Sequence, residues 1–505
     1  MKRPPLALLS VVAVLAAGLA VARADDPKPV TVAAPVRLDN RPVDGAMAVC
    51  PELLKEGDDV VTRLTAGVAT PGEVKVRAQK LTADQGLGSG VLVEGKSVGA
   101  LKLKSSSAVA AVVTATGPQS GGLEVEQVSR GADGPNRGWA GLRCEAPAAD
   151  SWFVGGSTLT GNDTELVLVN PFDDQALVRV ELYGKNGLID IPELDGIVLK
   201  ARARVTRDLA KFAPSESPLV IHVVAREGRV APAARVHRTI GEIPMGVDWL
   251  PRLTRPGTQV DLGGLPAGNG SRRLFFFVPG EDSAHIRIQF TLPDEQIVPA
   301  GFEDIDIPAG RPFSLNIAEV LSVTDQRTGE KTMQPVGLRV YAEGAPVLVT
   351  AFTESKARFT RIREIAYVGP ATALTGPTLV TEARNLGQMD CALLFHAPDG
   401  PARLEIVTLL SRGEKGTSVR KFVDVKQGEI VVYPYSKLPK DNLQSVVITP
   451  DPGLSPVFAS RYIFEYGNRG PLFTTQTLVT QPTSGLDVPV VVGDPSAALP
   501  AIKRD

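Results

Sequence analysis

The chain has 505 residues, long enough for several ordinary domains, and its 54 Lys and Arg residues nearly balance its 56 Asp and Glu residues. A formal net charge of -2 provides no overall field that attracts nucleic acid, so we expect no nucleic-acid partner. The hydrophobic share of 43% and the charged share of 22% are typical of a globular protein and exclude wholesale disorder.

The first residues have the pattern of a secretory signal. Lys2 and Arg3 precede an apolar run of 17 residues, 6–22, and the sequence Ala22-Arg23-Ala24 places small residues where a signal peptidase reads them. We therefore predict a signal peptide at 1–24 and a secreted or extracellular, cell-envelope associated protein. The alternative is that residues 6–22 are retained as an uncleaved anchor, which would be the chain's contact with a membrane.

Beyond the signal, the pattern predicts an all-β protein. Short segments such as 178–182 and 286–290 alternate apolar and polar residues and are closed by Gly, Pro, Asn or Asp, whereas long stretches of helical periodicity are scarce. An apolar strand that ends at a proline recurs every 108 to 120 residues. Its copies are 46–51, 165–171, 274–279 and 392–398.

A repeat of about 110 residues with six or seven short strands fits one β-sandwich. We therefore predict tandem immunoglobulin-like β-sandwich units; the alternative is a β-propeller-like repeat, whose blades hold four strands in about 40–50 residues. Turn-rich gaps divide the chain into the following segments: the signal peptide, unit 1 at 25–147, unit 2 at 148–246, unit 3 at 247–375, unit 4 at 376–482 and a C-terminal tail at 483–505.

The cysteines predict one disulfide. Cys50 and Cys144 bracket the first unit, 94 positions apart, and in an exported protein such a pair is expected to be oxidised. Cys391 then has no partner, and its position at the start of an apolar strand favours a buried, inert thiol over a nucleophile.

One charged stretch is a candidate surface. Lys200, Arg202 and Arg204 alternate with small residues, so on a strand they would form a basic stripe on one face. Such a stripe could meet an anionic envelope polymer, or it could be the solvated, edge-protecting face of an outer strand.

We predict no catalytic residues, no metal site and no cofactor. The sequence has no G-x-S-x-G nucleophile motif, and its four histidines do not lie at metal-ligand spacing. The carboxylates of 303–306 and of Asp173-Asp174 could offer oxygen ligands to Ca²⁺, but without a D-x-D-x-D-G pattern they are better read as solvated loop charge. Paired carboxylates from distant segments stay open as a glycosidase site.

The chain resembles a known family through a few motifs. Trp152-Phe153-Val154-Gly155-Gly156, followed by Gly161 and by 166–171 (Leu-Val-Leu-Val-Asn-Pro), resembles a repeat of exported actinobacterial proteins. Together with Cys50-Pro51 and the strand 231–234, these residues resemble the five-seven-one-nine family of unknown function. The third and fourth units depart from the pattern, because Val278-Pro279 and Ala397-Pro398 lack the asparagine. The resemblance implies export and a repeat, and it carries over no catalytic residue.

These patterns together suggest a non-enzymatic exported repeat protein that acts as a cell-envelope scaffold or interaction module, with an envelope polymer or protein as partner. Two alternatives stay open. One is an envelope carbohydrate-active or other hydrolase with a site between units, and the other is a membrane-tethered subunit of an envelope complex.

Overall fold

The computed structural model describes residues 38–489 apart from short segments at 42, 54–59, 70–73, 82–88, 95–97, 102–108, 135, 325–328, 330, 359, 382–388, 411–417, 439–442, 468 and 482–485. The predicted signal peptide at 1–24 and the alternative anchor at 6–22 lie outside the described residues. Among the described residues, no helix is both long and apolar enough to cross a membrane. The chain forms two compact units, one of which covers 42–484.

The smaller unit combines the two ends of the chain, residues 1–41 and 485–505. Its described part is one antiparallel pair, β1 (Leu38–Arg41) and β39 (Leu486–Pro489), in which Leu38 lies opposite Pro489. The predicted C-terminal tail therefore contributes a strand that pairs with the N-terminal side of the chain.

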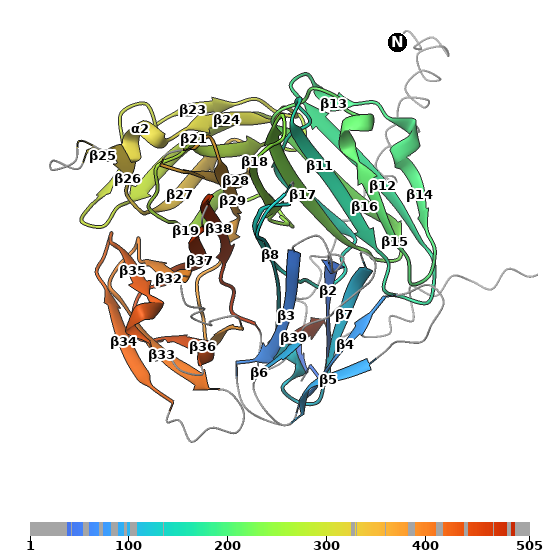
Figure 1. Cartoon of the computed structure of the whole chain (residues 1–505), viewed down its shortest axis with the longest axis horizontal. Coiled ribbons are helices and arrows are strands. Elements are labelled where there is room, and N and C mark those ends of the chain that lie inside the picture. The colour runs from blue at the N-terminus through green and yellow to red at the C-terminus, as the bar shows by residue number, and fades with distance from the viewer. Residues whose placement is uncertain are drawn as a thin grey trace, which may run out of the picture. The chain divides into compact units, whose positions relative to one another are not determined.

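The larger unit consists of four two-sheet sandwiches that follow one another along the chain, which confirms the predicted all-β class and the tandem architecture (Figure 1). The first two contain the following strands: β2 (Gly45–Leu53), β3 (Val60–Val68), β4 (Lys75–Lys80), β5 (Ser89–Glu94), β6 (Val98–Leu101), β7 (Val109–Thr116), β8 (Leu123–Gly131) and β9 (Gly138–Arg143) in sandwich 1; β10 (Asp150–Gly156), β11 (Asn162–Val169), β12 (Ala176–Gly184), β13 (Gly187–Ile189), β14 (Asp195–Leu199), β15 (Arg204–Asp208), β16 (Leu219–Glu227), β17 (Ala231–Ile240) and β18 (Ile243–Leu250) in sandwich 2.

The other two sandwiches are built in the same way and contain a single short α-helix, α2, among their described residues. Their elements are β19 (Gln259–Leu265), β20 (Arg272–Phe277), β21 (Ala284–Thr291), β22 (Gln296–Ile297), β23 (Ile305–Ile307), β24 (Phe313–Asn316), α2 (Ala318–Leu321), β25 (Ser322–Thr324), β26 (Lys331–Met333), β27 (Val336–Glu343), β28 (Leu348–Lys356), β29 (Arg363–Val368) and β30 (Pro370–Ala371) in sandwich 3; β31 (Thr378–Val380), β32 (Met389–His396), β33 (Ala402–Leu410), β34 (Arg420–Val425), β35 (Ile430–Pro434), β36 (Leu443–Pro450), β37 (Phe458–Gly467) and β38 (Gly470–Thr477) in sandwich 4.

All four sandwiches share one connectivity. One sheet has the order β2-β7-β4-β5 in sandwich 1 and β31-β36-β33-β34 in sandwich 4, and the other has the order β6-β3-β8-β9 and β35-β32-β37-β38. The chain thus crosses repeatedly between the two sheets of a sandwich, whereas the strands of a propeller blade follow one another within a single sheet. Alternating strands such as β12, with its regular buried and part-buried pattern, supply inward side chains to the core of each sandwich.

Two expectations from the sequence need correction. The predicted boundary at 246 falls within β18, which pairs with β17 so that Leu250 lies opposite Ala234; unit 2 therefore continues to the end of that strand. The first copy of the proline repeat also does not correspond to the other three, because it lies one strand earlier in its sandwich. Residues 46–51 belong to a first strand, β2, whereas the other three copies overlap the ends of the second strands β11, β20 and β32. Pro51 follows an apolar run as the repeat prolines do, but it lies within β2, where the pairing of β2 with β7 is irregular and a proline is tolerated.

The sandwiches pack head to tail. In each one, the sheet that contains the first strand packs against the sheet that contains the second strand of the next sandwich. Sandwich 1 meets sandwich 2 through an apolar cluster that includes Val112 and Val167, and sandwich 2 meets sandwich 3 where the rings of Trp152 and Phe277 lie 5.5 Å apart. Strand β19 of sandwich 3 contacts β32 and β37 of sandwich 4.

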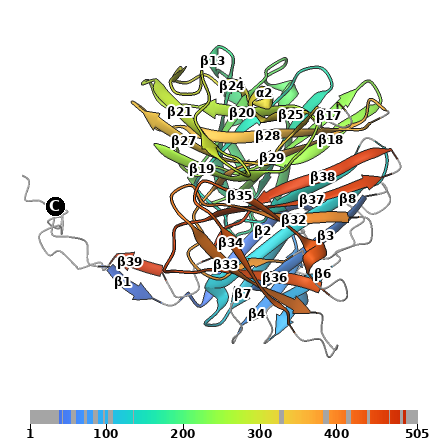
Figure 2. The same ribbon diagram turned by 90° about the vertical axis from the view of Figure 1, so that its left-hand side faces the viewer.

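The last contact closes the series, because sandwich 4 packs back on sandwich 1. Leu379 and Val447 cluster with Ala69, and the hydroxyls of Thr65 and Thr381 lie 2.7 Å apart. Figure 2 shows β37 next to β8 of the first sandwich, where Arg461 on β37 pairs with Glu126 on β8, and β38 contacts β9. Within 43–481 the sandwiches therefore form a closed cycle, in which every one of them has two neighbours.

The predicted disulfide is present. Cys50 on β2 is bonded to Cys144, directly after β9, with their Cα atoms 4.8 Å apart. The bond links the first strand of one sheet to the last strand of the other. Cys391 on β32 is buried, as predicted, and takes no part in this disulfide.

We expect the Cys50→Ala, Cys144→Ala double variant to lose about 4–5 kcal/mol of unfolding free energy, because the bond closes a long loop in the unfolded chain. Urea unfolding of the oxidised and reduced protein measures the difference. Cys391→Ala is the matched control and leaves the effect of reductant unchanged. An equal unfolding free energy for oxidised and reduced protein would contradict the prediction.

Candidate functional site

The final strands of the four sandwiches meet one another. Strand β9 contacts β18 and β38, and β29 contacts the same two strands, so the cycle closes here as well. Glycines permit the approach. A Cβ atom on Gly246, whose φ is +112°, would lie 2.5 Å from the amide nitrogen of Ile365, and one on Gly138 would lie 2.7 Å from a Val247 methyl group. Any side chain at either position would push the strands apart.

A hydrogen-bonded chain crosses this junction and includes all four sandwiches. The amide of Gly141 (sandwich 1) donates to Oγ1 of Thr474 (sandwich 4) over 3.0 Å. Thr474 Oγ1 donates to Oδ1 of Asp248 (sandwich 2) over 3.1 Å, and the amide of Tyr367 (sandwich 3) donates to Oδ2 over 3.0 Å. Asp248 therefore connects its own sandwich to the other three.

Burial governs the charge state of the junction. It raises the pKa of Asp248 well above its usual value, although the hydrogen bonds from Tyr367 and Thr474 lower it. Burial likewise raises the pKa of Glu364, whose Oε1 accepts the amide of Val247 over 3.1 Å. Both carboxyl groups hold their protons far more firmly than exposed acids do, because an ion would have to leave water.

A cavity of about 270 Å³ lies beside this junction and has walls from every sandwich. Arg143 and Glu145 come from sandwich 1, Trp249 from sandwich 2, Tyr367 from sandwich 3 and Gln476 from sandwich 4. No single sandwich could form this cavity by itself, because each contributes only part of the wall. It is therefore the candidate functional site.

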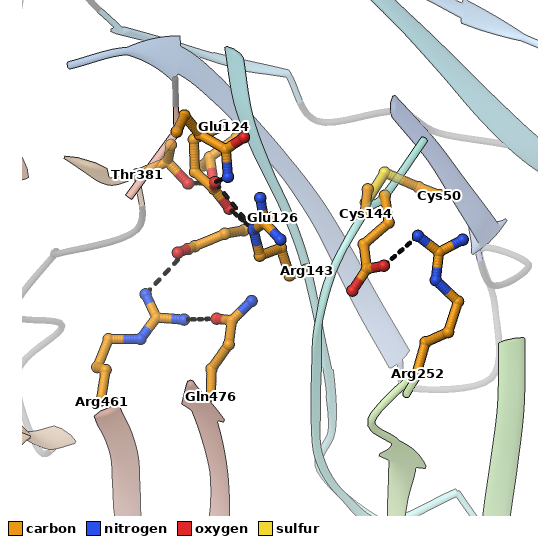
Figure 3. Close-up of polar contacts among 12 residues, drawn as sticks. Cys50, Glu124, Glu126, Arg143, Cys144, Arg252, Thr381, Arg461 and Gln476 are labelled. Atoms are coloured by element: carbon orange, nitrogen blue, oxygen red, sulfur yellow. Dashed lines mark hydrogen bonds and ion pairs between the residues drawn. A yellow bond between two sulfur atoms is a disulfide. The ribbon is translucent and has the colours of Figure 1, made fainter. Parts of the chain in front are cut away.

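The disulfide supports one wall of the cavity. Cys144 lies between Arg143 and Glu145 in the sequence, and the amide of Val49 donates to the carbonyl oxygen of Glu145 over 2.9 Å. Glu145 forms an ion pair with Arg252, whose Nη1 also donates to the carbonyl of Ala146 over 2.8 Å (Figure 3). The covalent bond and the ion pair thus fix both charged side chains on this wall.

Behind Arg143 lies a second group of buried charges. Arg143 Nε donates to both carboxylate oxygens of Glu124, over 2.8 and 2.9 Å, and Gln481 Nε2 donates to the same carboxylate over 3.1 Å. Burial raises the pKa of Glu124 to about 7, while Arg143 acts in the opposite direction. Glu124 therefore loses its negative charge at a milder acidity than an exposed glutamate does.

Gln476, which is 8% exposed, also lines the cavity. Its Oε1 accepts a hydrogen bond from Arg461 Nη2 over 2.5 Å, and Arg461 Nη1 lies 3.0 Å from Glu126 Oε2 across the contact between sandwiches 4 and 1 (Figure 3). The pairing with Arg461 fixes which way the amide faces, so that the amide nitrogen Nε2 of Gln476 is left without a partner among the described groups.

The remaining wall is largely apolar and aromatic. It includes the side chains of Phe153, Trp249 and Leu250, all of them buried, together with Pro232 and Pro251. Among the described residues that line the cavity, Glu145 is the only carboxylate, and it is paired with Arg252.

The predicted basic stripe is not formed. Lys200 and Arg202 lie in the turn between β14 and β15, with φ of +52° at Arg202, and Arg204 begins β15. The two strands belong to different sheets, because β14 pairs with β12 and β15 with β11. Small residues such as Ala201 and Ala203 suit this crossover as well as they suit a strand. The alternation of basic and small residues therefore did not distinguish a strand from a crossover. Arg202 pairs with Asp173, and Arg204 Nη2 lies 2.6 Å from Glu52 Oε2.

One group among the described side chains could hold a metal ion. The ligand atoms of His285, Asp304 and Asp306 lie within 4.8 Å of one another, and all three side chains are exposed. The register explains the grouping, because His285 on β21 lies opposite Asp306 on β23. Exposed acidic groups commonly occur without a metal, so solvated loop charge stays our prediction for 303–306.

The sequence did not reveal the cavity residues. Trp249 lies near a predicted unit boundary, which suggested a role in packing the end of a sandwich, and no motif links it to Arg143, Arg252 or Gln476. Two signals were usable. Cys144 stands between two of the lining residues, and the motifs of the family resemblance contain Pro51, Phe153 and 231–233, which also line the cavity.

We expect Asp248→Asn to be tolerated, because an amide can accept from Tyr367 and donate to Thr474. Asp248→Ala leaves both groups unpaired and should cost about 2–5 kcal/mol. Since the pKa of Asp248 is higher in the folded than in the unfolded state, the wild-type protein loses stability as the pH rises above about 4. Asp248→Asn removes that loss.

Urea unfolding at pH 5 and pH 8 measures this effect: the advantage of Asp248→Asn over wild type should be larger at pH 8. The exposed Asp174→Asn is the control and should show no such change. An advantage for Asp248→Asn that is larger at pH 5 would contradict the assigned protonation.

Comparisons with known proteins give a family but no activity. No curated protein matches the chain. A structure titled "Crystal Structure of Thermotoga maritima 1070" is 14% identical with a TM-score of 0.18 and covers 23% of this chain and 100% of its own. A β-glucuronidase 2 of Bacteroides uniformis, covalently bound to cyclophellitol-6-carboxylate aziridine, is 12% identical with a TM-score of 0.11; the match covers 46% of this chain and 29% of the enzyme. The model of the "Family of unknown function (DUF5719)" matches residues 100–434, from the first sandwich to the fourth, and the chain therefore belongs to this family.

Proposed function

We propose that the protein is an exported, non-enzymatic interaction module of the cell envelope, in which four sandwiches act as one rigid body. The observation that carries this proposal is that buried polar side chains of one sandwich bind groups of another. Asp248, Arg461 and Glu126 each bind a group of another sandwich, so the polar chemistry of the junction serves cohesion.

Rigid cohesion suits a scaffold. A closed cycle holds the outer surfaces of all four sandwiches in fixed relative positions, so that several weak contacts with one extended partner can be made together without a further entropic cost. A cell-envelope polymer or an envelope protein is the kind of partner that offers such repeated contacts.

Export is supported by the disulfide. Structural disulfides persist in oxidising compartments and are rare in the cytosol. The bond between Cys50 and Cys144 thus agrees with the secretory pattern of residues 1–24, which we propose to be cleaved.

The alternative of a hydrolase has a specific observation in its favour, because a cavity between the sandwiches exists. General acid–base hydrolysis of a glycoside uses two carboxyl groups that face the substrate. The described lining offers Glu145 alone, in an ion pair with Arg252, and Asp248 and Glu364 do not line the cavity. We therefore favour binding over catalysis. The further alternative, a membrane-tethered subunit, depends on residues 6–22.

Fractionation of cells that produce the full chain tests the proposal. We expect the protein in the exported or envelope fraction, with an intact mass that corresponds to a chain beginning at Asp25 and one disulfide. Purified protein should co-sediment with isolated cell envelopes and leave the envelope polymers intact. Full-length mass in the membrane fraction would support the tethered alternative, and release of sugars or peptides from envelopes would support the hydrolase.

A further inference from the structure

The cavity beside the junction has an excess of hydrogen-bond donors. Arg143 uses Nε for Glu124, and none of the described groups accepts a hydrogen bond from its two Nη atoms. Nε2 of Gln476 and Nε of Arg252 are both buried and have no partner among the described residues. Three side chains that line the same cavity therefore have N–H groups without an acceptor among the described residues.

Several acceptors on the same wall are already engaged. Glu145 is paired with Arg252, and the carbonyl oxygens of Tyr367 and Gly369 accept the hydroxyl hydrogens of Thr475 and Thr477, each over 3.0 Å. A ligand that fits this wall must bring acceptor oxygens. Buried donors without acceptors cost free energy, and a carboxylate, which accepts through both oxygens, is matched to the planar fork of an arginine.

The other wall requires an apolar body. Phe153, Trp249 and Leu250 are buried, and the cavity volume of about 270 Å³ is below the usual range of about 300–1,000 Å³ for drug-sized ligands. A small ring or branched chain therefore fits, whereas a long sugar polymer does not.

We propose that this cavity binds a small carboxylate with an apolar body, with the carboxylate at Arg143 and Gln476 and the apolar part against Trp249. We assign recognition of the charged head group to Gln476 as well, because Arg461 holds its amide so that Nε2 has no partner among the described groups. A carboxylate next to an apolar group occurs both in a free organic acid and at the C-terminus of a peptide.

Ligand binding in the cavity goes beyond the proposed function, and separate experiments can contradict each proposal. Envelope association concerns the outer surfaces and is measured with envelopes, whereas ligand binding concerns the cavity and is measured with the purified full chain in solution.

The experiment titrates the protein with 3-phenylpropionate and, separately, with its neutral analogue 3-phenylpropanamide. The fluorescence of Trp249 reports occupancy, and Trp249→Phe identifies that part of the signal. We expect saturable binding of the acid and binding of the amide that is weaker by about tenfold or more. Equal binding of acid and amide, or no binding of either, would overturn the proposal.

A second arm distinguishes the two sources of the carboxylate. It uses a tripeptide that ends in phenylalanine, once with a free C-terminus and once amidated. Stronger binding of the free-acid peptide than of 3-phenylpropionate assigns the cavity to peptide C-termini, and the opposite order assigns it to free acids. Both orders support carboxylate recognition.

Gln476→Glu tests the residue directly. The new carboxylate can still accept from Arg461, so this contact within sandwich 4 is kept, but the substitution removes the donor and adds a charge that repels the ligand. We expect a loss of acid binding of about tenfold or more, with an unchanged thermal transition. Gln289→Glu on β21 is the matched control and keeps full binding. Unaltered binding by a folded Gln476→Glu variant would overturn the assignment; the comparison of acid and amide on wild type holds even if this variant does not fold.

Discussion

The structure depends on the buried hydrogen-bonded chain that runs from Gly141 through Thr474 and Asp248 to Tyr367. Apolar contacts between neighbouring sandwiches are non-directional and would tolerate small rotations of one against the next. A buried aspartate that accepts from two other sandwiches tolerates far less, because an unpaired group inside the protein costs the full desolvation of that group. These hydrogen bonds therefore fix the relative positions of the four sandwiches. The glycines at 138 and 246 allow the strands to come close enough for the hydrogen bonds to form.

The cavity follows from that constraint. The walls of the cavity come from four sandwiches. The shape of the cavity therefore depends on how firmly the sandwiches are held relative to one another. The disulfide holds the wall that contains Arg143 and Glu145, and the contact of Arg461 with Glu126 holds the wall that contains Gln476. Buried polar groups such as Asp248 and Arg461 have partners in neighbouring sandwiches, which suits a rigid binding body better than a reaction centre. The donors that are left over at the cavity wall are the exception, and they point to recognition of an acceptor group.

Several features could be predicted because they depend on local patterns. Alternating segments such as 178–182 have one apolar face and therefore form half-buried strands, and the recurrence of such segments gives sandwiches of about the expected length. The pairing of Cys50 with Cys144 was predictable because an exported chain with two cysteines around one module has little choice. Other local patterns were ambiguous. Alternation of basic and small residues at 200–204 fits a strand, but it also fits the crossover between two sheets that the structure contains, and a proline after an apolar run marks the first strand of sandwich 1 as well as the second strand of the others.

The sequence by itself determined the β class, the serial modules, the covalent bond and the family resemblance, because each of these is encoded within a segment or in the spacing of a few residues. Only the tertiary structure decided that the modules close into a cycle, that Asp248 joins them and that Arg143, Trp249 and Gln476 line one cavity. Arg143, Trp249 and Gln476 are each separated by more than a hundred positions, and they meet because whole sheets pack against each other. The side chains at such contacts follow the relative placement of rigid bodies, for which the periodicity of a single strand contains no information.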